Sequence, residues 1–136
     1  MIKEDYVSFE IAKLLKEKGF SEPVSSVFAV KRKHEKISWF MQSFYVFNEN
    51  GTKDNYYISA PTVQLVMKWF REIFDINIQI SFANTHWCKD GWTCQVYDYH
   101  TNPEQPQKHY PNGTAPFSTY ELACKAAIKY CLENLI

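Results

Sequence analysis

The sequence predicts an α+β fold, a single domain over residues 1–136 in which an antiparallel β-sheet is packed by three helices. Three segments place apolar residues at helical spacing, and the segments between them alternate as strands do. The resulting order, α-β-β-β-α-β-β-α, is typical of helices gathered on an antiparallel sheet. A chain of 136 residues with 46% hydrophobic residues is large enough to build its core without disulfides.

The first two helices are marked by their flanking residues. The first is predicted over Tyr6–Lys18, because Gly19 suits a left-handed C-terminal position and Pro23 prevents continuation. The second is predicted over Pro61–Phe74, since proline is favoured in a first helical turn. Its apolar residues leave only a narrow polar stripe, which indicates a central helix or one covered by a second copy in a homo-oligomer.

The third helix is predicted from its N-terminal signals. Ser118 and Glu121 match a capping box, and Phe117 and Leu122 are spaced for a hydrophobic staple. Its core stripe is formed by four residues, with Ala127 and Leu132 beside them: Cys124, Ile128, Cys131 and Leu135.

Strands are predicted between the first two helices over Val24–Val30, Ile37–Phe47 and Tyr56–Ser59. The polar cluster at 31–36 separates the first two, and Asn48–Gly51 reads as a hairpin turn before the third. The alternation of the middle strand changes parity, which predicts a bulge near Gln42–Ser43.

The second half of the chain predicts an antiparallel pair. Ile76, Ile78, Ile80 and Phe82 alternate with polar residues, and a turn around Lys89–Gly91 leads to a strand from Trp92 to Tyr99. Residues 100–117 contain four prolines and no usable periodicity, so we expect a long loop there.

Composition excludes several classes of protein. The formal net charge is +0, which disfavours a purely electrostatic nucleic-acid binder. The basic cluster at 31–36 lies near Trp39 and fits a single-strand binding surface, although a solvated turn is the favoured interpretation. Four glycines form no phosphate-binding loop. Lys3, Glu4 and Asp5 make the N-terminus charged, and no apolar run reaches membrane length, so we expect a cytoplasmic protein with no membrane partner.

His86, Cys88, Cys94 and His100 have a spacing that could be written as a zinc site, H-x-C-x5-C-x5-H. They also allow a cysteine nucleophile with a histidine base. Because Cys94 shares a face with Trp92 and Val96, burial as a small apolar side chain is favoured over both. We therefore expect free thiols, no metal and no cofactor, and a protein that is more plausibly not an enzyme.

The region 84–110 gathers aromatic and polar side chains from a hairpin and the following loop. Aromatic residues with polar tips are favoured at interfaces and in pockets for planar ligands. Covering helices and hydroxyls at the surface explain the same pattern equally well. The predicted binding residues are the following: His86, Trp87, Lys89, Tyr97, Tyr99, His100, His109 and Tyr110.

Glu4–Phe20, Ala60–Thr62, Lys68–Glu72 and Ala126–Glu133 carry a resemblance to a known family. In these segments the chain resembles small uncharacterised proteins common in phages, prophages and mobile elements of gut Bacteroidales. The resemblance implies a bacterial cytoplasm and a phage or mobile-element gene, and it supplies no site residues. Small accessory proteins of this kind often bind host proteins or signalling nucleotides, which is an association and not a mechanism.

Three functions follow as hypotheses. The first is a non-enzymatic accessory protein that binds a host macromolecule, with a host protein as the partner. The second is a protein that sequesters a nucleotide between aromatic rings, with Lys89 or Arg32 on the phosphate. The third is a small enzyme that uses Cys88 or Cys94 with a histidine.

Overall fold

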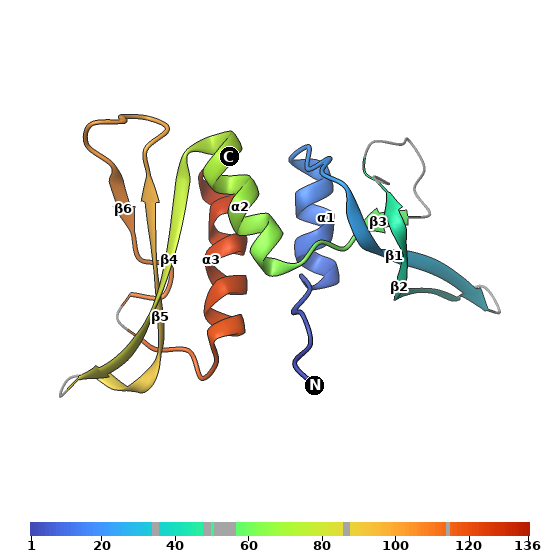
Figure 1. Ribbon diagram of the computed structural model, residues 1–136, viewed down its shortest axis with the longest axis horizontal. Helices are drawn as coiled ribbons and strands as arrows, with labels where there is room; N and C mark the ends of the chain where they lie inside the picture. Colours follow the sequence, from blue (N-terminus) through green and yellow to red (C-terminus); the bar gives the residue numbers. More distant parts are fainter. Residues whose placement is uncertain (34–35, 48–49, 51–56, 86–87, 114) are drawn as a thin grey trace. The chain divides into compact units, whose positions relative to one another are not determined.

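A computed structural model describes the chain except for residues 34–35, 48–49, 51–56, 86–87 and 114. It confirms the α+β class, with three helices and antiparallel strands (Figure 1). The strands form two three-stranded sheets, where the sequence predicted one, and the order gains a strand before the last helix. The chain divides into two compact units, unit 1 at residues 1–62 and unit 2 at 63–136.

In unit 1, helix α1 spans Phe9–Glu17 and begins three residues later than predicted. Ser8 is its N-cap, because the Ser8 hydroxyl accepts a hydrogen bond from the Ile11 amide at 3.3 Å. Tyr6 forms an antiparallel bridge with Thr62 and is therefore outside the helix. The predicted C-terminus is confirmed: Gly19 has a φ of 84°, and the Phe20 amide donates to the Leu15 carbonyl at 2.9 Å, as in a Schellman motif.

The sheet of unit 1 has the order β2-β1-β3, formed by β1 (Val24–Lys33), β2 (Lys36–Phe47) and β3 (Tyr57–Ser59). The predicted hairpin between β2 and β3 at Asn48–Gly51 is wrong, because both strands pair with β1. Lys31–Lys33 and Lys36 belong to the strands themselves. The predicted bulge is confirmed next to its expected place: Ser26 pairs with Ser43, whereas Val24 pairs with Phe47.

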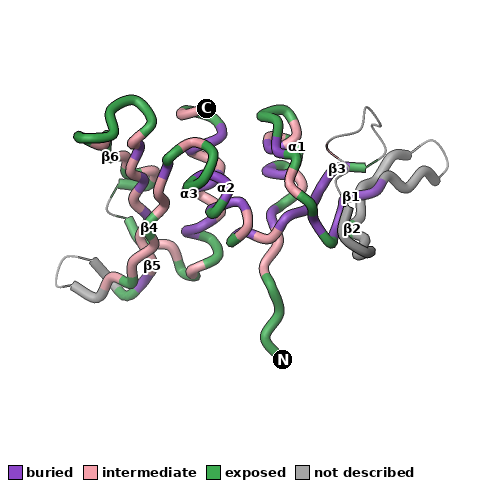
Figure 2. Tube along the Cα trace, turned by 45° about the horizontal axis from the view of Figure 1, so that its top comes forward, coloured by how far each residue is buried: buried purple, intermediate pink, exposed green. Residues whose placement is uncertain are grey.

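Unit 2 packs α2 (Val63–Phe74) and α3 (Tyr120–Asn134) on one face of the sheet β4-β5-β6. Its strands are β4 (Ile76–Thr85), β5 (Cys88–Asp98) and β6 (Gln107–His109). Figure 2 shows buried residues on the helices and on the strands that they cover. The largest side chains of this core are fully buried: Val66, Phe70, Ile76, Val96, Ile128 and Leu132.

Helix α2 begins at Val63, two residues later than predicted. Its apolar residues are accounted for mostly inside unit 2, since Val66, Met67, Trp69 and Phe70 are buried. Ile73 is the exception among its large aliphatic residues, with 58% of its surface exposed. Most of the apolar face for which the sequence suggested a partner subunit is therefore buried in the core of unit 2.

The hairpin of unit 2 is longer than the sequence predicted. Thr85 pairs with Cys88, and Ala83 pairs with Gly91. The turn predicted around Lys89–Gly91 is therefore wrong, because these residues lie inside β5. A charged pair followed by glycine is a common turn signal. Here the glycine is needed because Pro116 packs closely against the backbone of Gly91: a Cβ on Gly91 would lie 2.5 Å from the Cβ of Pro116.

The predicted loop at 100–117 contains ordered pairing. Strand β6 pairs with β5 through Val96–His109 and Asp98–Gln107. Further along, Phe117 and Trp92 exchange two backbone hydrogen bonds, of 2.9 and 2.7 Å. A three-residue strand is too short to show a period, which is why the sequence did not indicate it.

Helix α3 is capped by Thr119 and not by Ser118. The Thr119 hydroxyl accepts a hydrogen bond from the Leu122 amide at 3.1 Å. This shift by one residue removes the predicted capping box and the staple, and Leu122 is 49% exposed. The core stripe is confirmed for Cys124, Ala127, Ile128, Cys131 and Leu132, which are fully buried; Leu135 is partly exposed. No helix in the described part of the chain is long and apolar enough to cross a membrane.

Candidate binding surface

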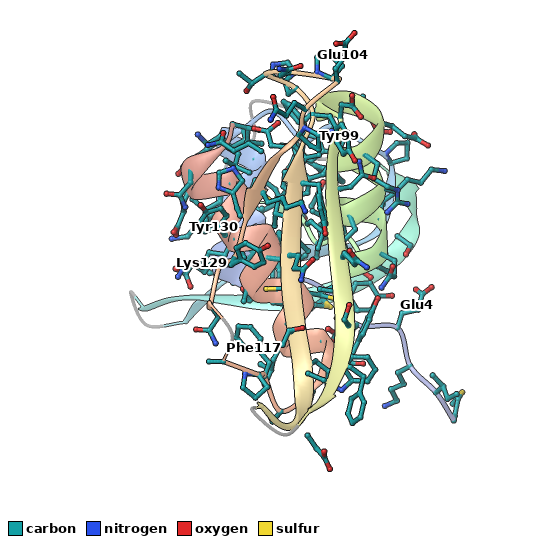
Figure 3. All side chains as sticks on the ribbon, turned by 90° about the vertical axis from the view of Figure 1, so that its left-hand side faces the viewer. Glu4, Tyr99, Glu104, Phe117, Lys129 and Tyr130 are labelled. Atoms are coloured by element: carbon teal, nitrogen blue, oxygen red, sulfur yellow. The ribbon has the colours of Figure 1, made fainter. Side chains whose placement is uncertain are left out.

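The two faces of the β4-β5-β6 sheet differ sharply. The inner face is the one that α2 and α3 cover; it carries the buried Ile76, Cys94 and Val96. Residues paired across strands point to the same side, so the register defines the opposite, outer face. Figure 3 views the sheet from the side on which the strands lie in front of the helices. The described residues of the outer face include Asn77, Gln79, Ser81, Ala83, Gly91, Thr93, Gln95, Tyr97 and Lys108.

Among the outer-face residues that the structure describes, Tyr97 is the one aromatic residue, and it lies on the central strand. Its hydroxyl donates a 2.7 Å hydrogen bond to the side-chain oxygen of Gln95. The Lys108 ammonium, on the neighbouring β6, lies 5.6 Å from the centroid of the Tyr97 ring, within cation–π range. The two neighbours hold the ring in place, and Tyr97 remains partly exposed.

A second group of rings lies on the inner face, away from Tyr97. Phe82 and Trp92 meet edge to face at 5.2 Å, and Trp92 meets Tyr120 of α3 at 5.3 Å. The side-chain amide of Gln64 donates to the Tyr120 hydroxyl at 3.2 Å and so links α2 to this cluster. Phe82 is nevertheless 56% exposed, which leaves part of the cluster open to solvent.

The predicted binding residues of the hairpin turn fall largely outside the described residues. His86 and Trp87 are not described, and the same holds for the side chain of Lys89 within β5. Their proposed role stays a prediction.

The other predicted residues do not form one site. Tyr97 lies on the outer face, whereas His109 is on the inner face, where its Nδ1 is 2.9 Å from the Tyr130 hydroxyl of α3. Tyr99 follows the end of β5, and its amide donates to the Asp75 carbonyl at 3.1 Å. His100 is exposed, with its amide bonded to the Asp98 carboxylate at 2.9 Å, and Tyr110 is 53% exposed. Residues that are close together in the sequence, such as Tyr97 and His109, thus lie on opposite faces of the sheet.

The cysteines behave as core residues where the structure describes them. Cys94, Cys124 and Cys131 are free thiols and buried. Burial, followed by the nearby Asp98 and Cys94, raises the pKa of Cys131 to about 12. Burial also raises the pKa of Cys94. Among the described residues no group of three or more His, Cys, Asp or Glu side chains could hold a metal ion. A thiol kept protonated is a poor nucleophile and a poor metal ligand.

Sequence reasoning missed Gln95, Lys108 and Asn77 as members of the outer face. The alternation of β4 had shown that Asn77, Gln79 and Ser81 share a side, but not which strand lies next to them. Lys108 belongs to β6, whose three residues give no periodic signal. Cross-strand neighbours are set by register, and register is a long-range property.

The chain stands apart in comparisons with known proteins. No protein-family model matches it, and no curated protein and no solved structure gives a significant match.

Proposed function

We propose that this chain is a non-enzymatic binding protein, an accessory protein of phage or mobile-element origin, that recognises a host protein through the outer face of unit 2. The observation that carries the proposal is Tyr97, which Gln95 and Lys108 hold near the end of the central strand, on a sheet face that no helix of its unit covers. Tyrosine is enriched at protein interfaces because it combines a large ring with a hydroxyl.

The rest of the outer face fits a protein partner better than a nucleic acid. Asn77, Gln79, Gln95, Ser81 and Thr93 offer amide and hydroxyl groups for hydrogen bonds but carry no charge. Nucleic-acid binding depends strongly on Lys and Arg contacts to phosphate, and Lys108 is the one cation among the outer-face residues whose side chains the structure describes. A polar face on which Lys108 is the one described cation and Tyr97 the ordered ring suits a moderately polar protein interface.

The test uses the full chain and two tyrosine variants. The chain is used to capture proteins from a bacterial host lysate, the captured protein is identified, and its Kd is then measured with purified components. Because anchor residues at interfaces are worth about 2 kcal/mol or more, we expect Tyr97→Ala to weaken binding about 30-fold.

The matched control is Tyr57→Ala, which removes an exposed tyrosine of β3 in unit 1. We expect its Kd to be unchanged. Equal affinity of the wild type and a folded Tyr97→Ala variant for the identified partner excludes the outer face as the recognition surface.

A nucleotide ligand is the second candidate, and the contact between Lys108 and Tyr97 favours it. An aromatic ring beside a cation can stack a base and meet a phosphate. In a thermal-shift screen of cyclic and linear nucleotides, a ligand at 100 times its Kd stabilises the protein by about 2.7 kcal/mol. A shift that Lys108→Ala abolishes supports this function, and the absence of any shift contradicts it.

A further inference from the structure

Strand β4 is a long, open sheet edge. It spans Ile76–Thr85 and pairs on one side with β5, whereas the order β4-β5-β6 places no described strand on its other side. The opposite side of β5 is occupied by β6 and by the bridge between Trp92 and Phe117. In Figure 3, β4 is the yellow-green strand at the right-hand border of the sheet.

This edge lacks the features that keep edge strands from pairing. Natural proteins protect such edges with charged residues, proline, bulges or very short strands. The ten residues of β4 include no charged residue and no proline. The pairing of β4 with β5 is regular from Ile76 to Ala83, and the register shifts only between Ala83 and Thr85. A regular, neutral edge of this length is suited to pairing with another strand.

Exposed apolar side chains occur near both ends of β4 in the sequence. Phe82, near the end of β4, is 56% exposed. Ile73, three residues before β4 and on the helix that packs against it, is 58% exposed. Specific dimers bury about 1,200–2,000 Å² in total, and these two side chains offer apolar area beyond that of the strand itself.

We infer that two copies of this chain pair antiparallel through β4 and join their sheets into one. Antiparallel neighbours that keep their helices on the same side are related by a twofold axis perpendicular to the sheet. Such an axis pairs residues of equal parity, so inner-face residues meet inner-face residues. The regular stretch Ile76–Phe82 is centred on Gln79, and the axis therefore passes beside that residue.

This register makes the strand complementary to itself. On the inner face, Ile78 pairs with Ile80 of the partner subunit, and Ile76 pairs with Phe82 of the partner subunit, which covers the exposed ring. On the outer face, Asn77 pairs with Ser81 of the partner subunit, and the two Gln79 amides meet. The neutral edge gives no attraction to a charged strand and no repulsion between copies, which favours a second copy as the occupant.

The first experiment is disulfide crosslinking of variants of the full chain that each carry one introduced cysteine. All of them carry Cys88→Ser, so that the native cysteines that remain are the buried Cys94, Cys124 and Cys131. Directly opposed residues of antiparallel strands have Cα atoms about 4.5–5.5 Å apart, within disulfide range. Gln79→Cys is therefore expected to form a disulfide-linked dimer under mild oxidation. Ser81→Cys, on the same face of the same strand, is the control; in this register its two copies are about 14 Å apart and stay unlinked.

The second experiment measures mass in solution. The wild type is expected at twice 16.1 kDa, and Gln79→Lys, which opposes two ammonium groups at the axis, at the mass of one chain. Thr93→Lys, on the outer face of the central strand, is expected to remain a dimer.

A wild-type mass of 16.1 kDa at the highest soluble concentration overturns the inference, and so does an open-ended assembly. A dimer that Gln79→Cys fails to link, or that Ser81→Cys links equally well, overturns it as well. The inference is independent of the proposed function: Tyr97→Ala is expected to leave the mass unchanged, so the loss of partner binding and the loss of the dimer are separately observable.

Discussion

At the scale of single residues, the thiols of unit 2 owe their chemistry to burial. Cys131 is fully buried between α3 and the sheet, near Asp98 and Cys94, and its pKa is about 12. An ordinary thiol titrates near pH 8.5. The folded protein therefore holds Cys131 as a neutral thiol across the range in which a solvated cysteine ionises, and the thiolate is the reactive form.

We predict that Cys94, Cys124 and Cys131 resist thiol-specific labelling of the native protein at pH 7–9. Because burial raises the pKa of Cys131 to about 12 and also raises the pKa of Cys94, raising the pH to 9 leaves Cys131 unreactive, whereas an exposed thiol gains reactivity steeply. Mass spectrometry counts the labelled sites, and labelling in denaturant serves as the control, with all four cysteines modified. Rapid labelling of any of the three in the native protein contradicts the prediction and supports the hypothesis of an enzyme with a cysteine nucleophile.

At the scale of elements, the start of α3 depends on which of two adjacent hydroxyls caps it. Thr119 accepts the hydrogen bond from the Leu122 amide. We therefore expect Thr119→Ala to lower the free energy of unfolding by about 1 kcal/mol. Ser118→Ala, one residue away, is expected to change the free energy of unfolding very little. The measurement is the midpoint of urea unfolding, which reports the change in stability when the dependence of the unfolding free energy on urea concentration is unchanged. Equal effects, or a larger effect of Ser118→Ala, show that the cap is at Ser118.

The elements show how far local sequence signals reach. The end of α1 at Gly19 and the buried stripe of α3, apart from Leu135, were predicted correctly, because they depend on residues within a few positions. The capping-box pattern at Ser118 and Glu121 gave the wrong N-terminus for α3, because the hydroxyl that accepts from the Leu122 amide belongs to the adjacent Thr119. The signal at Lys89–Gly91 failed for a tertiary reason: Gly91 is needed where Pro116 and Phe117 approach β5.

At the scale of the whole molecule, alternation identifies strands but not their partners. β3 follows β2 in the sequence and yet pairs with β1, and the six strands divide between two sheets. The same limitation applied to the candidate site. Tyr97 and His109 are close in sequence, but they lie on opposite faces, because β6 places His109 opposite Val96 and toward α3. Pairing between distant segments decides which residues share a surface.

The division into two units leads to a prediction about folding. Unit 2 contains its whole sheet, both covering helices and a buried core that includes Phe70 and Val96. We therefore expect a fragment of residues 63–136 to fold alone and to unfold cooperatively in urea, with modest stability for its size. Phe70→Ala in the fragment is the control. It is expected to lower the free energy of unfolding by about 3–5 kcal/mol and so to abolish the cooperative unfolding transition. A wild-type fragment without a cooperative transition, beside a full chain that has one, shows that residues 63–136 depend on unit 1 for their fold.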